Sequence, residues 1–167
     1  MQAAASKQGR QLDFTAHFAA LRSLQGKYAE SVALYRKILA RQPNNALALN
    51  NLAFLIAEYE NKPADALALL KQAWEQSGPS VVLSDTRAFV YLKQGEAKRA
   101  IEELEELVSN SARPEAYFHL AQAHEEAGDR GAALLAFLKT RDLKMKPTSL
   151  HPMERGKYLQ MVQRFQR

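Results

Sequence analysis

Apolar residues along this chain recur every three or four positions in a series of short segments, which is the spacing of amphipathic α-helices. The segments come in pairs joined by short polar turns. Breaks that contain proline, such as those at 42–45 and 77–80, separate one pair from the next, because proline cannot continue a helix. The pattern predicts an all-α protein built from helical hairpins.

The hairpins resemble one another, which indicates an internal repeat. Four alanines lie at matching positions: Ala19, Ala53, Ala88 and Ala121. The second hairpin has Glu60 where a turn glycine is expected, and the other three alanines precede such a glycine by seven residues: Gly26, Gly95 and Gly128. A period near 34 residues is typical of stacked helix pairs that bury their apolar faces against neighbouring pairs. We therefore expect a right-handed α-α superhelix (solenoid) of about four pairs.

The repeat also sets the expected boundaries. Four hairpins are predicted at 12–45, 46–80, 81–113 and 114–146. Residues 1–11 are an N-terminal extension, and 147–167 are a linker followed by a C-terminal capping helix, because a helical stack needs a last element with one polar face. We expect Asn45 to cap the first helix of the second hairpin and Pro63 to open its second helix.

Two local patterns bear on how the hairpins pack. In the first hairpin, Phe14, Phe18, Leu21 and Leu24 form an apolar stripe at helical spacing. The third hairpin has Arg87 directly before its alanine, where the others have an apolar residue. We expect the stem of Arg87 to pack while its guanidinium reaches solvent. A buried ion pair or a ligand-facing guanidinium is the alternative interpretation.

The recurring small and aromatic residues resemble those of the tetratricopeptide repeat. The segment Ala-Phe-Val-Tyr-Leu-Lys-Gln-Gly at 88–95 with Ala100, and Leu-Ala-Gln-Ala at 120–123 with Gly128 and Ala133, carry the resemblance. Tyr28, Tyr35 and Pro43 supply further family positions in the first hairpin. The resemblance covers about residues 12–146 and is closest to bacterial arrays. It implies a non-catalytic protein–protein interaction scaffold that binds a peptide or partner helix in a concave groove.

In this family the first helix of each pair lines the inner surface, and the resemblance then places seven residues in the groove: Asn50, Asn51, Phe54, Asp85, Phe89, Phe118 and Gln122. The three phenylalanines would anchor an apolar strip of the ligand, and the two asparagines would bond its backbone. An equally open interpretation is that the phenylalanines fill the packing between repeats, because helical registers drift by a residue.

Motifs for catalysis or for cofactor and metal binding are missing from the sequence. There is no cysteine, so disulfides and thiolate metal sites are excluded. His119 and His124 are five residues apart and do not share a helix face as a zinc-binding pair would. We expect the histidines to be solvated or packed. The protein is predicted not to be an enzyme and to need no cofactor or metal.

The charge is concentrated at the C-terminal end. The whole chain carries +5, whereas residues 139–167 hold eight Lys or Arg against Asp142 and Glu154, a net of +6. Such a segment is most often the solvated face of terminal helices. The alternative functions are binding of nucleic acid, the less favoured partner, or of an anionic surface through this region, and a structural segment of a larger multi-domain protein. The oligomeric state is left open.

No apolar run reaches the roughly 20 residues that span a bilayer, and the N-terminus lacks the apolar core of a signal peptide. These features favour a soluble protein, cytoplasmic rather than periplasmic. A removed signal peptide would allow the periplasm.

Overall fold

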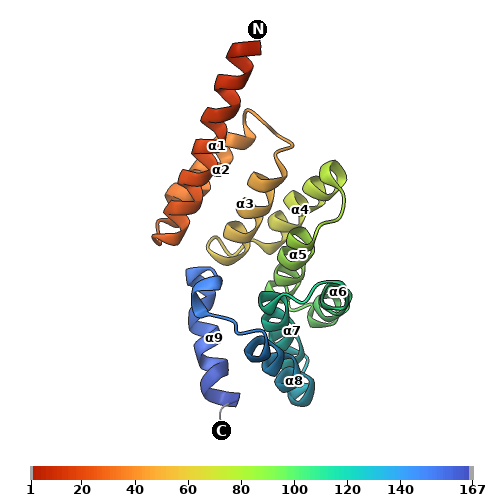
Figure 1. The fold of residues 1–167 in the computed structure, drawn as a ribbon. Helices are drawn as coiled ribbons and strands as arrows, with labels where there is room; N and C mark the ends of the chain where they lie inside the picture. Colours follow the sequence, from red (N-terminus) through yellow and green to blue (C-terminus); the bar gives the residue numbers. More distant parts are fainter. Residues whose placement is uncertain (1, 166–167) are drawn as a thin grey trace. The chain divides into compact units, whose positions relative to one another are not determined.

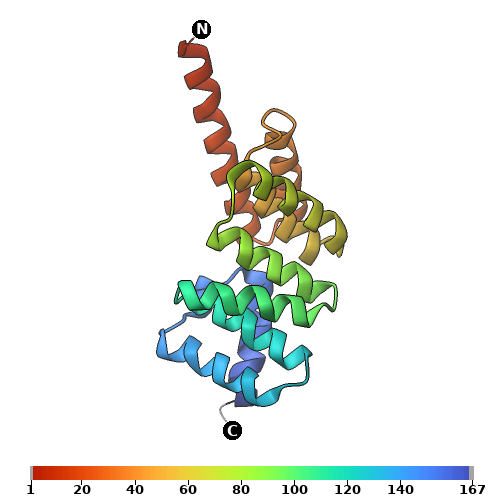
Figure 2. The same ribbon diagram turned by 90° about the vertical axis from the view of Figure 1, so that its right-hand side faces the viewer.

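The computed structural model describes the backbone of residues 2–165 and the side chains of residues 13–165. Within that range it confirms the all-α helical-repeat fold (Figures 1 and 2). The chain divides into two compact units, residues 1–78 and 79–167, and each is described by itself. Of the predicted N-terminal extension at 1–11, residues 2–11 belong to the first helix, and their side chains lie outside the described residues.

Unit 1 contains two helical hairpins, α1 (Gln2–Leu24) with α2 (Tyr28–Leu39) and α3 (Ala46–Glu58) with α4 (Pro63–Ser77). Unit 2 contains α5 (Val81–Lys93) with α6 (Ala97–Asn110), α7 (Pro114–Glu126) with α8 (Arg130–Asp142), the short 3-10 helix η1 (Pro147–Ser149) and α9 (Pro152–Phe165). None of the described helices combines the length and apolar character that crossing a membrane requires.

The helix starts follow from residues that satisfy the first free backbone N–H groups. As predicted, the side chain of Asn45 accepts a hydrogen bond from the Ala48 N–H at 3.0 Å, and Pro63 is the first residue of α4. Ser80 caps α5 and Asp129 caps α8 in the same way as Asn45. Local sequence therefore fixes where these helices begin.

The turns inside the hairpins need a left-handed backbone. Gly26, Gly95 and Gly128 have φ of 77°, 76° and 84°. In the second hairpin Asn61, with φ 54°, takes this role. Asparagine tolerates the left-handed region better than other non-glycine residues, which explains how this turn closes without glycine.

The four repeat alanines are completely buried, each with 0% exposure: Ala19, Ala53, Ala88 and Ala121. Paired helices can approach to about 8–10 Å, and small residues at the contact allow the shorter distances. In the first hairpin the hydroxyl of Ser31 in α2 donates a 2.8 Å hydrogen bond to the backbone oxygen of Ala19 in α1. The alanines thus mark the contact surfaces that the repeat pattern predicts.

The first helix departs from its apolar stripe. Phe14, Leu21 and Leu24 are 71%, 47% and 57% exposed, and α1 instead buries Ala16 and Ala19. The apolar stripe of the first hairpin is therefore not the buried face of α1, which packs on α2 through small residues.

Arg87 also differs from the expectation of a solvent-reaching guanidinium. Its Nε and Nη2 donate to the carboxylate of Glu103 in α6 at 2.9 and 2.7 Å. The two side chains are only 27% and 13% exposed. A two-pronged guanidinium–carboxylate contact joins α5 to α6, so Arg87 has a structural role within the third hairpin.

We predict that Ala88→Leu lowers the free energy of unfolding by about 1–3 kcal/mol, because the added atoms overpack a filled contact. Urea unfolding followed by circular dichroism measures the change. The control is Ala33→Leu on the exposed side of α2, which should stay within about 0.5 kcal/mol of the parent. Equal stability of Ala88→Leu and the parent protein would contradict the assigned register.

Candidate functional site: the inner helices of unit 2 and α9

Helix α9 lies against the first helices of the unit 2 hairpins. Both ribbon views place it on the side of α5 and α7 that faces away from α6 (Figures 1 and 2). Its buried residues are Glu154, Tyr158 and Met161, which share one face of the helix at spacings of four and three. Helix α9 therefore covers the side of α5 and α7 on which the resemblance predicts the groove of unit 2.

Aromatic rings fill the contact between α9 and the repeats. The ring of Tyr158 lies 5.5 Å from Phe118 in α7, edge to face, and 5.7 Å from Phe137 in α8. Phe137 also lies 5.3 Å from Phe165 near the end of α9. Edge-to-face and tilted pairs at such distances are favourable because the ring quadrupoles complement each other.

Ion pairs flank these rings. Lys157 of α9 pairs with Glu126 of α7 at 3.2 Å, and Arg164 pairs with Glu125. These groups are partly exposed, so each pair contributes modestly to stability. They nevertheless match a basic side of α9 to the acidic end of α7.

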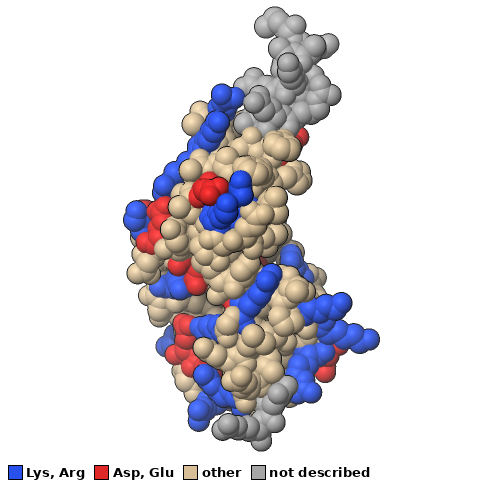
Figure 3. Space-filling view, turned by 90° about the vertical axis from the view of Figure 1, so that its left-hand side faces the viewer, with Lys and Arg blue, Asp and Glu red and all other residues tan. Residues whose placement is uncertain are grey.

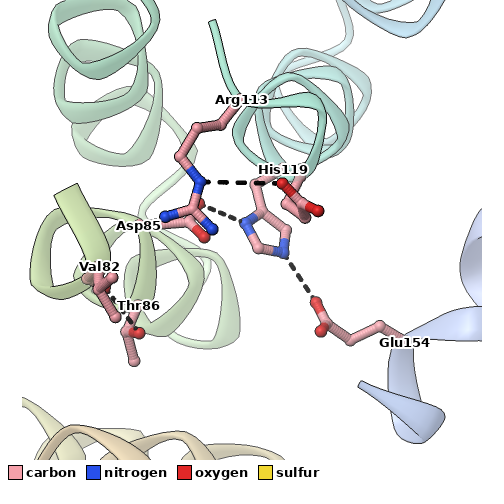
Figure 4. Close-up of polar contacts among 7 residues, drawn as sticks. Val82, Asp85, Thr86, Arg113, His119 and Glu154 are labelled. Carbon is pink, nitrogen blue, oxygen red and sulfur yellow. Dashed lines mark hydrogen bonds and ion pairs between the residues drawn. The ribbon is translucent and has the colours of Figure 1, made fainter. Parts of the chain in front are cut away.

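The most unusual feature of the contact is a buried histidine held between two carboxylates (Figure 4). Nδ1 of His119 in α7 lies 2.7 Å from Oδ1 of Asp85 in α5, and its Nε2 lies 2.7 Å from Oε1 of Glu154 in α9. The side chains of His119 and Glu154 are only 6% and 8% exposed. We call Asp85, His119 and Glu154 the clasp.

With both carboxylates accepting, the clasp needs a proton on each ring nitrogen. An ionised carboxylate only accepts hydrogen bonds, and a neutral imidazole has a single N–H to donate. The doubly protonated ring satisfies both carboxylates at once. Burial on its own would lower the pKa of His119, but the charges and hydrogen bonds of Asp85 and Glu154 override it and raise the pKa well above its ordinary value.

The surroundings of the ring keep water away from the clasp. Phe89 and Phe118 lie 5.8 and 5.6 Å from the imidazole. Arg113 points toward Asp85 in Figure 4, and its Nε lies 3.8 Å from Glu115. In such a poorly solvated site the attraction between unlike charges is stronger than at the surface.

This arrangement uses both ring nitrogens of His119. With both ring nitrogens donating, His119 has no lone pair with which to accept a proton from a substrate. Within the described part of the chain, no three His, Asp or Glu side chains converge on a point where a metal ion would sit. The chemistry available here is the recognition of a carboxylate beside an aromatic surface.

The four groove residues predicted in unit 2 are all at or near this contact. Phe118 is 0% exposed and touches α9, while Phe89 and Gln122 are 4% exposed. Asp85 is engaged with His119. In this conformation Phe118 serves packing, the interpretation left open beside ligand binding. We call Phe118, His119 and Phe137 the α9 seat.

The three groove residues predicted in unit 1 differ in their environments. Nδ2 of Asn51 donates a 3.0 Å hydrogen bond to the hydroxyl of Tyr35, so Asn51 holds α3 to α2. Burial raises the pKa of Tyr35, and this hydrogen bond opposes the rise. Asn50 is buried, but its Oδ1 has no hydrogen-bond partner among the described residues. Phe54 is half-buried.

The basic end of the chain serves partly to hold α9. Besides Lys157 and Arg164, Arg155 donates a 3.2 Å hydrogen bond to the backbone oxygen of Leu150. Lys139, Arg141, Lys144 and Lys146 are exposed, and basic side chains are frequent on the face of unit 2 seen in Figure 3. Arg167 lies outside the described residues.

Unit 2 should lose stability as the pH rises. In the unfolded chain the pKa of His119 is about 6.5. Because its folded pKa is raised, the contribution of the clasp is fully present below that pH and is lost as the pH rises through the folded pKa. We predict that the difference in free energy of unfolding between the parent and His119→Gln shrinks from about pH 6 to about pH 9. Urea unfolding at each pH measures it.

The control for this measurement is His17→Gln, since His17 is exposed and its Nδ1 contacts only the backbone oxygen of Asp13 in its own helix. Its difference from the parent should be smaller than that of His119→Gln at about pH 6. A difference for His119→Gln that widens at high pH would show that the clasp holds a neutral ring.

Comparisons with known proteins agree with the repeat architecture. The family model of the tetratricopeptide repeat matches residues 57–117. A search among curated proteins finds none whose sequence matches this chain. A crystal structure of MamA protein is 22% identical, with a TM-score of 0.61 over 81% of this chain and 74% of that one.

Two further solved structures share the fold. The MamA segment 41-end from Desulfovibrio magneticus RS-1 is 16% identical, with a TM-score of 0.64 over 93% of this chain and 94% of that one. Pseudomonas aeruginosa pilF is 17% identical, with a TM-score of 0.71 over 85% of this chain and 65% of that one. The match shows a tetratricopeptide repeat at residues 57–117, and the similar structures show that the chain has the fold of a tetratricopeptide repeat array.

Proposed function

We propose that this tetratricopeptide repeat protein is a non-catalytic scaffold for protein–protein interaction that binds a peptide or a partner helix on the inner faces of its repeats. The observation that carries the proposal is the seating of α9 on α7 and α8 of unit 2. A surface that accommodates an amphipathic helix through aromatic and carboxylate contacts has the chemistry of helix-in-groove recognition.

Unit 1 supports the proposal with a second surface. Buried polar groups are nearly always hydrogen-bonded, so the Oδ1 of Asn50 is an exception that needs an explanation. In the proposed complex it would accept a hydrogen bond from an N–H group of the incoming ligand. Phe54 lies four residues further along α3, on the same face, and is half-buried. Asn50 would then bond the ligand backbone while Phe54 anchors an apolar side chain.

Binding through the basic C-terminal region is the second candidate. Four exposed basic residues between 139 and 146 favour it. Against it, three of the remaining basic residues are used in contacts within unit 2: Arg155, Lys157 and Arg164. Their place in the structure is explained by the docking of α9. Phosphate binding would weaken steeply with salt, whereas binding to an apolar inner face would not.

The proposal predicts that Phe54→Ala reduces recovery of the natural partner at least about tenfold, because anchor residues at the centre of an interface carry most of the binding energy. Affinity capture from a native extract, with quantitative mass spectrometry of the recovered proteins, measures this. The matched control is Gln76→Ala on the exposed side of α4, which should recover the same partner as the parent. Full recovery of every partner by a folded Phe54→Ala protein would contradict binding at α3.

A further inference from the structure

We propose that α9 is a displaceable internal ligand, and that the α9 seat is the docking site of an external amphipathic helix with a carboxylate and, four residues later, an aromatic side chain. This inference rests on the proposed function and specifies the chemistry of the partner. It is drawn from α9 itself, whose contacts show what the seat accepts.

The seat joins one charged contact to an apolar surface. Nε2 of His119 faces outward from α7 to Glu154, because Asp85 holds Nδ1 from behind and fixes the orientation of the ring. Phe118 and Phe137 lie beside it and receive Tyr158. Glu154 and Tyr158 are four residues apart and therefore share a helix face. A partner helix needs the same pair at the same spacing.

The carboxylate gives the seat its selectivity. A helix with glutamine at the position of Glu154 would form a hydrogen bond to Nε2 without the charge attraction. A helix with lysine there would place a second cation against the protonated ring in a buried site, which is strongly unfavourable. The seat thus distinguishes acidic helices from neutral and basic ones of equal apolar character.

Helix α9 contains a feature that weakens it as an occupant. Gly156 lies inside the helix, between the two contact residues Glu154 and Tyr158. A Cβ built at this glycine meets no atom within 4 Å, and its φ does not lie in the left-handed region, so neither packing nor backbone conformation requires glycine there. Glycine in a helix interior favours the unfolded segment. Gly156 therefore makes α9 easier to displace without changing the face that fits the seat.

The connection to the repeats allows such displacement. Leu150 is only 3% exposed, so its burial holds the linker to unit 2, and displacement of α9 would bend the chain directly before Pro152. A tethered helix competes at an effective concentration of about millimolar. An external helix must therefore bind the seat better than α9 does. The stability of the contact between α9 and the seat sets the affinity that a partner needs.

Fluorescence anisotropy on the chain of residues 1–167 tests the inference. The probe is a labelled peptide with the sequence of residues 150–165 and the change Gly156→Ala. Compared with the parent chain, Gly156→Ala in the chain itself should weaken peptide binding about fivefold by strengthening α9. Tyr158→Ala in the chain should strengthen peptide binding about tenfold or more by weakening α9. Gln160→Ala, an exposed position of α9, is the matched control and should equal the parent.

Variants of the peptide test its chemistry. Replacing its glutamate at position 154 by glutamine, or its tyrosine at 158 by alanine, should weaken binding to the Tyr158→Ala chain at least about tenfold. Equal affinity of the parent, Gly156→Ala and Tyr158→Ala chains would overturn the inference. So would a lack of binding to a Tyr158→Ala chain that keeps its helix content. Dimers of the parent chain in sedimentation velocity that are lost in the Tyr158→Ala chain would also overturn it, since the α9 of a second copy would then occupy the seat.

A locked chain separates this inference from the proposed function. The protein has no cysteine, so Glu126→Cys and Lys157→Cys joined by a short bismaleimide link α9 to α7 at a single place. The locked chain should lose peptide binding. If it still captures the natural partner as well as the parent does, the α9 seat is not the docking site, and binding at α3 of unit 1 remains as the proposed function.

Discussion

In unit 2 one imidazole is shared by two carboxylates that come from two different helices, and the arrangement of the unit depends on it. Asp85 reaches His119 from α5, and Glu154 reaches it from α9. Because both contacts require a proton on the ring, the charge of His119 joins three helices that local sequence alone would not bring together. The aromatic contacts of Tyr158 add apolar burial around this charge. A carboxylate-bearing helix is thereby held on the inner side of the repeats.

The repeat brings these groups near one another. Asp85 and His119 are 34 residues apart, and His119 and Glu154 are 35 apart, which is close to the repeat period. Counted from the repeat alanines, Asp85 lies three residues before Ala88 and His119 two residues before Ala121, so the two positions differ by one. In unit 1 the positions equivalent to His119 are His17 and Asn51, and both bond elsewhere. This position is thus polar in each hairpin, and it becomes a charged link only where carboxylates face it.

The sequence predicts the helix pairs, the caps at Asn45 and Pro63, and the buried alanines, because these depend on spacing and on local backbone chemistry. It does not predict that α1 leaves Phe14, Leu21 and Leu24 exposed, since that depends on how α1 packs on α2. Nor does it predict that α9 covers Phe118, which depends on contacts distant in sequence. The sequence contains one sign of the clasp, because its three titratable residues are separated by nearly the repeat period. That sign is not visible when His119 is considered on its own.

The protonation state of His119 is the property on which the interpretation of unit 2 depends. Long-range nitrogen–proton NMR on the intact chain at about pH 7.5 reports it directly, through the chemical shifts of the two ring nitrogens. A raised pKa predicts an imidazolium, with both nitrogens protonated and both ring N–H protons protected from exchange with water. A neutral ring with one protonated nitrogen at that pH would contradict the charged link between α5, α7 and α9.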